Sequence, residues 1–205
     1  KGIKLINGKN KLLFYISASI DKITIQIDNL LRQFSKKDAT LTWTIEGPFD
    51  SSYSLSILNR AFSKALQKRI NKLFIHLTEG FGDYSPNIQY LKKYPKIYEL
   101  YNKSKKISFK SNVISRNLYP PRVVDMKAKY NILHSYGWEE SAFPNDWVDD
   151  FNSYLQGITV MSEQVKKILI DNGVQLPIKV SGLGLDHLAN ITSIEDFKLK
   201  AKKFK

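Results

Sequence analysis

The chain has 205 residues, of which 42% are hydrophobic and 25% are charged. These values are typical of a globular domain and exclude a chain that is mainly disordered. The sequence contains no cysteine, which excludes disulfides, thiolate metal sites and thiol catalysis. Its net charge is +13 at pH 7, so nucleic acid, an anionic membrane and an acidic substrate are all candidate partners. No stretch approaches the roughly 20 apolar residues of a transmembrane helix, and we recognise no secretory signal.

Residues 1–40 differ in pattern from the rest of the chain. Asp21 is the predicted cap of a helix over residues 22–34, in which apolar side chains recur at helical spacing. A polar joint follows at residues 35–39. We expect residues 1–40 to form an N-terminal helical arm or the tail of a preceding region. Because the chain begins with Lys1 and ends in a lysine-rich stretch, we also expect it to be a segment of a longer protein.

From residue 41 onward, predicted strands alternate with predicted helices. Runs of β-branched and aromatic residues predict the strands, and apolar residues three and four apart predict the helices. The predicted strands are residues 41–45, 72–78, 111–115, 130–134, 157–161 and 178–180. The predicted helices are residues 53–66, which present a broad apolar face, 90–101 with an interruption near Pro95, 144–155 and 165–172. This alternation predicts an α/β domain with a mostly parallel sheet of six strands flanked by helices.

A site is expected in the loops that follow the predicted strands. In a parallel α/β sheet, ligands bind outside the carboxyl ends of the strands, near the point where the strand order reverses. The first of these loops, residues 47–54, brings N–H groups and hydroxyls to a helix N-terminus, which favours an anion such as a diphosphate. It does not match the GxGxxG pattern of dinucleotide-binding loops. The candidate substrate-binding residues are Gly47, Asp50, Ser51, Ser52, Tyr53, Ser54, Arg116, Tyr136, Glu139 and Glu140.

His134 is the candidate catalytic residue. It ends a predicted strand, and two carboxylates, Glu139 and Glu140, follow close behind. A histidine there can donate to a substrate hydroxyl or phosphate, or act as a base near neutral pH, although a lone histidine is also often structural. His76 lies inside a predicted buried strand and is expected in the core, whereas His187 is expected to be exposed. Three histidines without cysteine give no metal-site spacing, so no metal is expected.

Several strings of the sequence resemble one known family. They are YNILHSYGWEESAFP at residues 130–144, GPFDSSYSLSILNR at 47–60 and GITVMSEQVKKIL at 157–169, followed by VSGLGLD at 180–186. In this order they resemble the N-terminal, acceptor lobe of family-4-like glycosyltransferases (glycosyl transferase group 1), which have the GT-B fold. The resemblance extends over residues 41–186, which is most of the chain.

The resemblance implies a Rossmann-like lobe at residues 41–187 and an interdomain linker at 188–205 that leads to a missing C-terminal donor lobe. In that family the N-lobe usually holds the acceptor, and the C-lobe usually binds a nucleotide sugar. The resemblance therefore implies a cytoplasmic glycosyltransferase that moves a sugar from a nucleotide-sugar co-substrate to a glycan or lipid-linked acceptor, with retention and without a metal cofactor. The paired glutamates of the donor lobe are absent, so this fragment alone is expected to be inactive.

The resemblance also relates two candidate features to the substrates. His134 corresponds to the family's histidine near the transferred sugar, and residues 47–54 correspond to the glycine-rich loop near the donor phosphates and the acceptor. The family's common double glycine is replaced here by Pro48 and Phe49. We expect the ring of His134 to face the open cleft near this loop and to hydrogen-bond the transferred sugar.

The charge is distributed unevenly along the chain. Residues 92–129 carry eleven Lys or Arg against two acids, and residues 130–163 carry six acids and no Lys or Arg. We expect the basic stretch to border the acceptor side of the cleft and to meet an anionic partner, such as the inner face of a membrane. A lysine-rich solvated face is the simpler interpretation. Two other functions stay open: a basic domain that binds nucleic acid or an anionic surface without catalysis, and a non-catalytic α/β module that binds a ligand.

Overall fold

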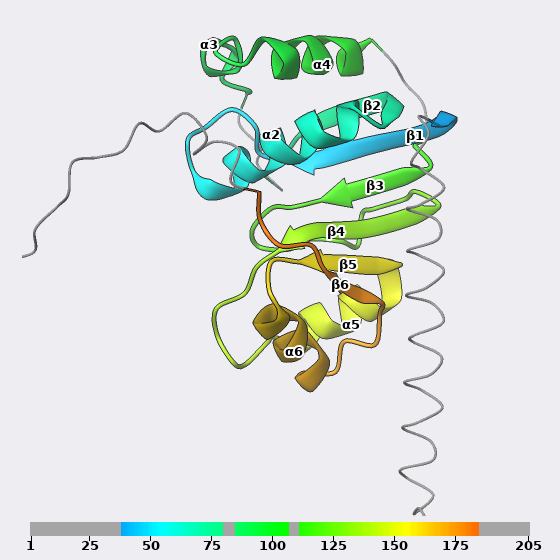
Figure 1. The fold of residues 1–205 in the computed structure, drawn as a ribbon. Helices are drawn as coiled ribbons and strands as arrows, with labels where there is room; N and C mark the ends of the chain where they lie inside the picture. The colour runs from blue at the N-terminus through cyan, green and yellow to red at the C-terminus, as the bar shows by residue number, and fades with distance from the viewer. Residues whose placement is uncertain (1–37, 80–84, 107–110, 185–205) are drawn as a thin grey trace, which may run out of the picture.

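The computed structural model describes residues 38–79, 85–106 and 111–184 (Figure 1). Residues 38–40, which were expected in the arm, open the first strand instead. The rest of the predicted arm, the predicted linker and His187 lie outside the described residues.

Within the residues that the structure describes, six parallel strands form one sheet (Figure 1). The strands are β1 (Asp38–Gly47), β2 (Ile70–Leu77), β3 (Val113–Arg116), β4 (Tyr130–Tyr136), β5 (Gly157–Val160) and β6 (Ile178–Val180). Their order across the sheet is β2-β1-β3-β4-β5-β6, and every neighbouring pair is parallel. The predicted α/β, Rossmann-like fold is therefore confirmed. Strand β2 pairs with one edge of β1, and β3, the next strand along the chain, pairs with the other edge of β1. The strand order therefore reverses between β1 and β3.

The connecting helices follow the predicted positions with one division. They are α2 (Ser54–Gln67), α3 (Ile88–Leu91), α4 (Pro95–Lys105), α5 (Asn145–Tyr154) and α6 (Glu163–Asp171). The predicted interruption near Pro95 is confirmed: α3 ends at Leu91, and Pro95, which lacks an N–H, occupies the first turn of α4. Ser162 caps α6 by accepting a hydrogen bond from the Val165 N–H at 3.2 Å. Within the described ranges, no helix has the length and apolar character that a bilayer crossing requires.

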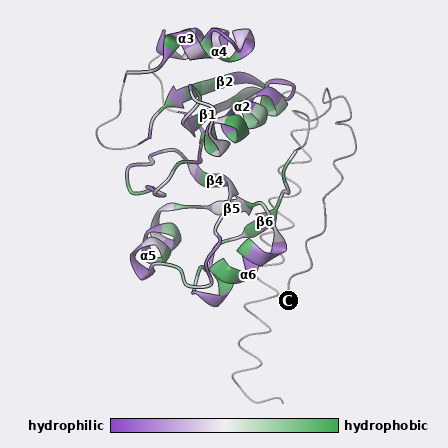
Figure 2. Ribbon diagram, turned by 90° about the vertical axis from the view of Figure 1, so that its left-hand side faces the viewer, coloured by the Kyte–Doolittle hydropathy of each residue, from purple (hydrophilic) through white to green (hydrophobic). Residues whose placement is uncertain are grey.

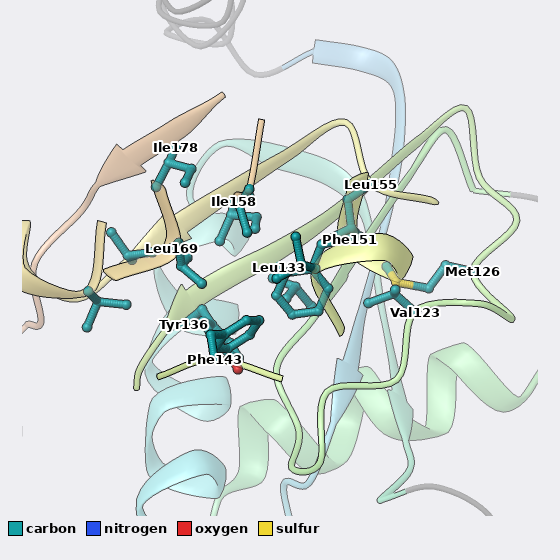
Figure 3. Packing of buried hydrophobic residues seen from close by; sticks show 14 residues of the cluster. Val123, Met126, Leu133, Tyr136, Phe143, Phe151, Leu155, Ile158, Leu169 and Ile178 are labelled. Carbon is teal, nitrogen blue, oxygen red and sulfur yellow. The ribbon is translucent and has the colours of Figure 1, made fainter. Parts of the chain in front are cut away.

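The two faces of the sheet are covered by different helices. Trp43 and Ile45 of β1 pack with Phe62 and Leu66 of α2. Leu133 of β4, which the strand register places on the opposite face, packs with side chains of α5 and α6 (Figure 3). Burial on both faces is what the near-continuous apolar runs of parallel strands require.

Helix α4 lies along the outer edge of β2 (Figure 1). The Ser104 hydroxyl accepts a hydrogen bond from the Ile75 N–H at 2.9 Å, and Lys103 Nζ donates to the Asn71 carbonyl at 3.4 Å. These contacts satisfy backbone groups that an edge strand otherwise leaves open to another chain.

Candidate functional site

Helix α2 turns a polar stripe toward the sheet. The buried residues of this helix are Ser56, Asn59, Arg60 and Ser63. Apolar residues lie outside the stripe, and Ile57 is 38% exposed. The apolar face that the sequence predicts is therefore only partly buried: Phe62 and Leu66 pack against the sheet, but the most buried positions of the helix are polar. The stripe is polar because carbonyl groups at the ends of the neighbouring strands need donors at this place.

The buried side chain of Arg60 holds the first loop, residues 47–54, against α2. Its Nη1 donates to the carbonyls of Phe49 at 2.6 Å and Ser51 at 2.7 Å. Its guanidinium lies over the ring of Tyr94, with Cζ 4.4 Å from the centroid. Two carbonyl dipoles and an aromatic face thus compensate the buried charge. The hydroxyls of Ser51 and Ser56 are also hydrogen-bonded, at 2.7 Å, so the loop is held to α2 at several points.

Asn59 joins the residues that follow β1 and β3 to a residue within β4. Its Nδ2 donates to the carbonyls of Pro48, after β1, and of Asn117, after β3, both at 3.0 Å. Its Oδ1 lies 2.8 Å from Nε2 of His134 on β4. Gly47 permits this close packing, because a Cβ there would lie 2.3 Å from the Asn117 carbonyl oxygen, and its φ is +146°. The point where the strand order reverses is therefore closed by side-chain hydrogen bonds.

His134 is fully buried, with 0% of its surface exposed. Its ring stacks on Phe62 at a centroid distance of 4.2 Å. Because Asn59 uses its Nδ2 on two carbonyls, its Oδ1 accepts the Nε2–H of His134, which leaves Nδ1 as the unprotonated nitrogen. Burial lowers the pKa of His134 to about 3, so the ring is neutral.

The expectation that the His134 ring faces an open cleft is wrong. Strand β4 does not end at this residue but continues to Tyr136, so His134 is an interior strand residue beneath α2. Its Nδ1 has no hydrogen-bond partner among the residues described. In this position the ring holds α2 and the strand ends together.

Tyr136 is also buried, on the side of α5 and α6 (Figure 3). Its ring packs edge-on against Phe143 and Phe151, at centroid distances of 6.3 and 5.7 Å. Burial raises the pKa of its hydroxyl, which has no hydrogen-bond partner in the described ranges. The expected substrate contact through Tyr136 is therefore wrong. The register shifts between Leu133 and Tyr136, where Ser135 has φ 50°, and the strand then directs the tyrosine into the core.

The first loop presents several of its candidate residues to solvent. Ser52 and Ser54 are exposed, and Tyr53 is the N-cap residue of α2. The Tyr53 hydroxyl donates to Glu79 Oε1 at 2.8 Å, and burial together with this carboxylate raises its pKa, so the hydroxyl stays protonated at neutral pH. Asp50 Oδ2 accepts the backbone N–H that precedes α3 at 2.6 Å. The structure thus brings the predicted loop residues together at the N-terminus of α2.

Arg116 is engaged by two carboxylates. Its Nε donates to Glu46 Oε2 at 2.8 Å, and its Nη1 donates to Asp125 Oδ1 at 2.6 Å. Nδ1 of His76 lies 3.5 Å from Glu46 Oε1. Burial alone would raise the pKa of Glu46, but the hydrogen bond from His76 and the charge of Arg116 outweigh burial and lower it. This ion-pair cluster joins the carboxyl ends of β1, β2 and β3 on the face opposite α2.

His76, which was expected in the core, has a side chain that is 64% exposed. His76 lies on the face of the sheet opposite α2, beside a cavity. His76, Glu46 and Asp125 line a cavity of about 580 Å³ together with Tyr101 and Lys127. No sequence pattern singled out these carboxylates, because they lie on segments that become neighbours only through the strand order.

Glu139 and Glu140 follow β4 at the carboxyl edge of the sheet, and both are exposed. An aromatic cluster lies next to them in the chain. Trp138 packs edge-on against Trp147 at 5.6 Å, and Trp147 packs against Tyr119 at 6.1 Å. Exposed carboxylates beside aromatic rings suit a ligand that has both hydroxyl groups and apolar faces.

The basic residues of the stretch 92–129 are divided between the carboxyl ends and the amino ends of the strands. Arg116 and Arg122 are close to Asp125 in the ion-pair cluster. The lysines of residues 103–106 and 127–129 lie instead where the chain approaches the starts of β3 and β4. These segments therefore lie away from the first loop, although Lys105 and Lys127 also line the cavity beside Glu46 and Asp125.

Among the residues that the structure describes, no group of three His, Asp or Glu side chains is placed to hold a metal ion. Comparison with models of known protein families, with curated proteins and with solved structures gives no match.

Proposed function

We propose that this chain forms the acceptor-side lobe of a glycosyltransferase of the GT-B type that uses a nucleotide-sugar donor. The observation that carries the proposal is the set of hydrogen bonds from Asn59, which fixes the first loop, Asn117 and His134 relative to one another. They lie where the strand order reverses, which is where parallel α/β sheets bind ligands. The resemblance of residues 41–186 to acceptor lobes supports the same function.

In this proposal the exposed groups of the carboxyl edge meet the substrates. Ser52, Tyr53 and Ser54 lie at the N-terminus of α2, where the helix dipole favours the negative charge of a diphosphate. Glu139 and Glu140 accept hydrogen bonds from hydroxyls of the acceptor. In the GT-B enzymes that the sequence resembles, a second lobe supplies the remaining donor contacts, and the proposal assigns them to such a lobe here.

His134 is a positioning residue in this proposal and not a base. Its Nε2–H is committed to Asn59, and its lowered pKa of about 3 keeps the ring neutral. In the transfer, the acceptor oxygen forms a bond to the anomeric carbon of the sugar. The bond from that carbon to the diphosphate oxygen breaks, the diphosphate leaves with the electron pair, and the hydroxyl proton passes to the diphosphate. The lobe contributes orientation and a favourable field for the developing charge.

The test uses the full-length product of the gene with a panel of nucleotide sugars, and it measures release of nucleoside diphosphate. We expect one donor to give release well above background. The double variant Ser52→Ala/Ser54→Ala should lower kcat/KM by about tenfold or more with an unchanged melting temperature. The control Ser153→Ala changes an exposed serine of α5 and should leave activity unchanged. No release from any donor, or full activity of the double variant, would count against the proposal.

A further inference from the structure

Basic residues collect at the edge of the sheet opposite the candidate site. Because the strands are parallel, the segments that lead into them lie at one edge, the amino edge. Three such segments are residues 68–72 at the start of β2, 103–106 at the end of α4 and 127–129 before β4. They contain seven lysines, one arginine and no Asp or Glu. We call these eight cationic side chains the basic edge.

The basic edge is exposed, and no carboxylate of the described residues neutralises its charge. All eight residues are exposed, and none forms a salt bridge with a carboxylate of the described ranges. The contact from Lys103 Nζ to the Asn71 carbonyl brings the end of α4 against the start of β2, so two of the segments are adjacent. The like charges repel one another, and an anionic partner would relieve this repulsion.

The aromatic rings beside the basic edge are already covered by its lysines. The cation–π pairs are Lys103 with Phe74 at 5.1 Å, Lys105 with Tyr101 at 5.2 Å and Lys129 with Tyr130 at 5.2 Å. Proteins that bind single-stranded nucleic acid need open ring faces on which bases stack, and bidentate phosphate contacts need arginine. The basic edge offers occupied ring faces and compact lysine charges, which fit a diffuse anionic surface better than a nucleic acid.

We propose that the basic edge binds the surface of a bilayer that contains anionic lipids. Clusters of several lysines are the electrostatic signature of such binding. Helix α4, whose residues are mostly hydrophilic in Figure 2, would lie at this surface beside the starts of β2 and β4. The first loop lies at the other edge of the sheet and stays open to substrates. This inference goes beyond the proposed function and does not rest on it.

The test measures binding of the 205-residue chain to phosphatidylcholine vesicles with and without phosphatidylglycerol, by co-sedimentation at low ionic strength. Each lysine near an anionic surface changes the partition by about fivefold, so K103Q/K105Q/K106Q should bind about 100-fold more weakly to the anionic vesicles. Added salt should weaken the binding of the unchanged chain.

A matched variant removes the same charge elsewhere. K166Q/K167Q/K179Q changes three lysines of α6 and β6, at the other end of the strand order from β2, and should keep nearly all of the binding. Circular dichroism should show the same fold for both variants. Absence of binding to anionic vesicles, or an equal loss in the two variants, would overturn the proposal. Stronger binding of polyuridylate RNA than of vesicles, weakened by K103Q/K105Q/K106Q, would assign the basic edge to nucleic acid instead.

Discussion

Lowering the pH should destabilise the folded chain through His134. In the folded state burial lowers the pKa of this histidine to about 3, from the value of 6.5 that it has in an unfolded chain. Between these two values the unfolded state binds a proton that the folded state does not. Stability is therefore greatest above pH 6.5 and is lost as the pH falls from 6.5 toward 3.

The size of the effect follows from the two pKa values. Below the pKa of the unfolded state, each pH unit costs about 1.4 kcal/mol of unfolding free energy. Lowering the pH from 6.5 to about 5, before most carboxylates titrate, should therefore cost about 1.5–2 kcal/mol. Burial is the cause of the shift, and the ring stacks on Phe62 with no carboxylate partner in the described ranges.

Urea melts between pH 6.5 and about 5 measure this slope. His134→Gln cannot take up the proton, and its amide can still donate to Asn59 Oδ1, so its unfolding free energy should fall less over the same range. His76→Gln is the matched control, because that side chain is 64% exposed, and it should retain most of the original slope. If the unfolding free energy of His134→Gln falls with pH as steeply as that of the unchanged chain, the inference that the buried His134 ring is neutral is refuted.

Two further pairs of substitutions test the hydrogen bonds at the strand ends, and urea melts measure both. Asn59→Ala leaves two carbonyls and the His134 Nε2–H without partners, so it should cost about 3 kcal/mol or more of unfolding free energy. Its control, Asn152→Ala, removes two hydrogen bonds at an exposed site and should cost about 1 kcal/mol of unfolding free energy. Gly47→Ala should cost about 3 kcal/mol or more because of its positive φ and the blocked Cβ position. Gly184→Ala meets nothing within 4 Å and should change stability by less than about 0.5 kcal/mol. Losses equal to those of the controls would contradict the described packing.

The strands could be predicted because their causes are local. β-branched and aromatic runs placed a strand at residues 130–134, and β4 begins at Tyr130 as predicted. The sequence pattern did not show that the strand continues to Tyr136, because the register shift near Ser135 depends on the partner strand β5. The order of the strands also depends on contacts between distant segments, so the ion pair between Glu46 and Arg116 could not be predicted.

The burial of His134 could not be predicted because it depends on the polarity of α2. Apolar residues in the range 53–66 recur at helical spacing, and that pattern predicts an apolar buried side. Asn59 and Arg60 face the sheet instead, because they satisfy carbonyls of segments that the sequence does not show to be neighbours. A signal was present, since the polar residues of this helix also recur three and four apart. They are Ser56, Asn59, Arg60 and Ser63.

The polar stripe of α2 has a consequence for the order in which the chain folds. Hydrophobic collapse gains little from burying Asn59 and Arg60 until the carbonyls that they bind are in position. The two carbonyls that Asn59 binds follow β1 and β3, so these hydrogen bonds of α2 can form only after the two strands have aligned. Interactions that form late affect the rate of unfolding more than the rate of folding. The loss of stability in Asn59→Ala should therefore appear mainly as faster unfolding, because the hydrogen bonds of Asn59 form late.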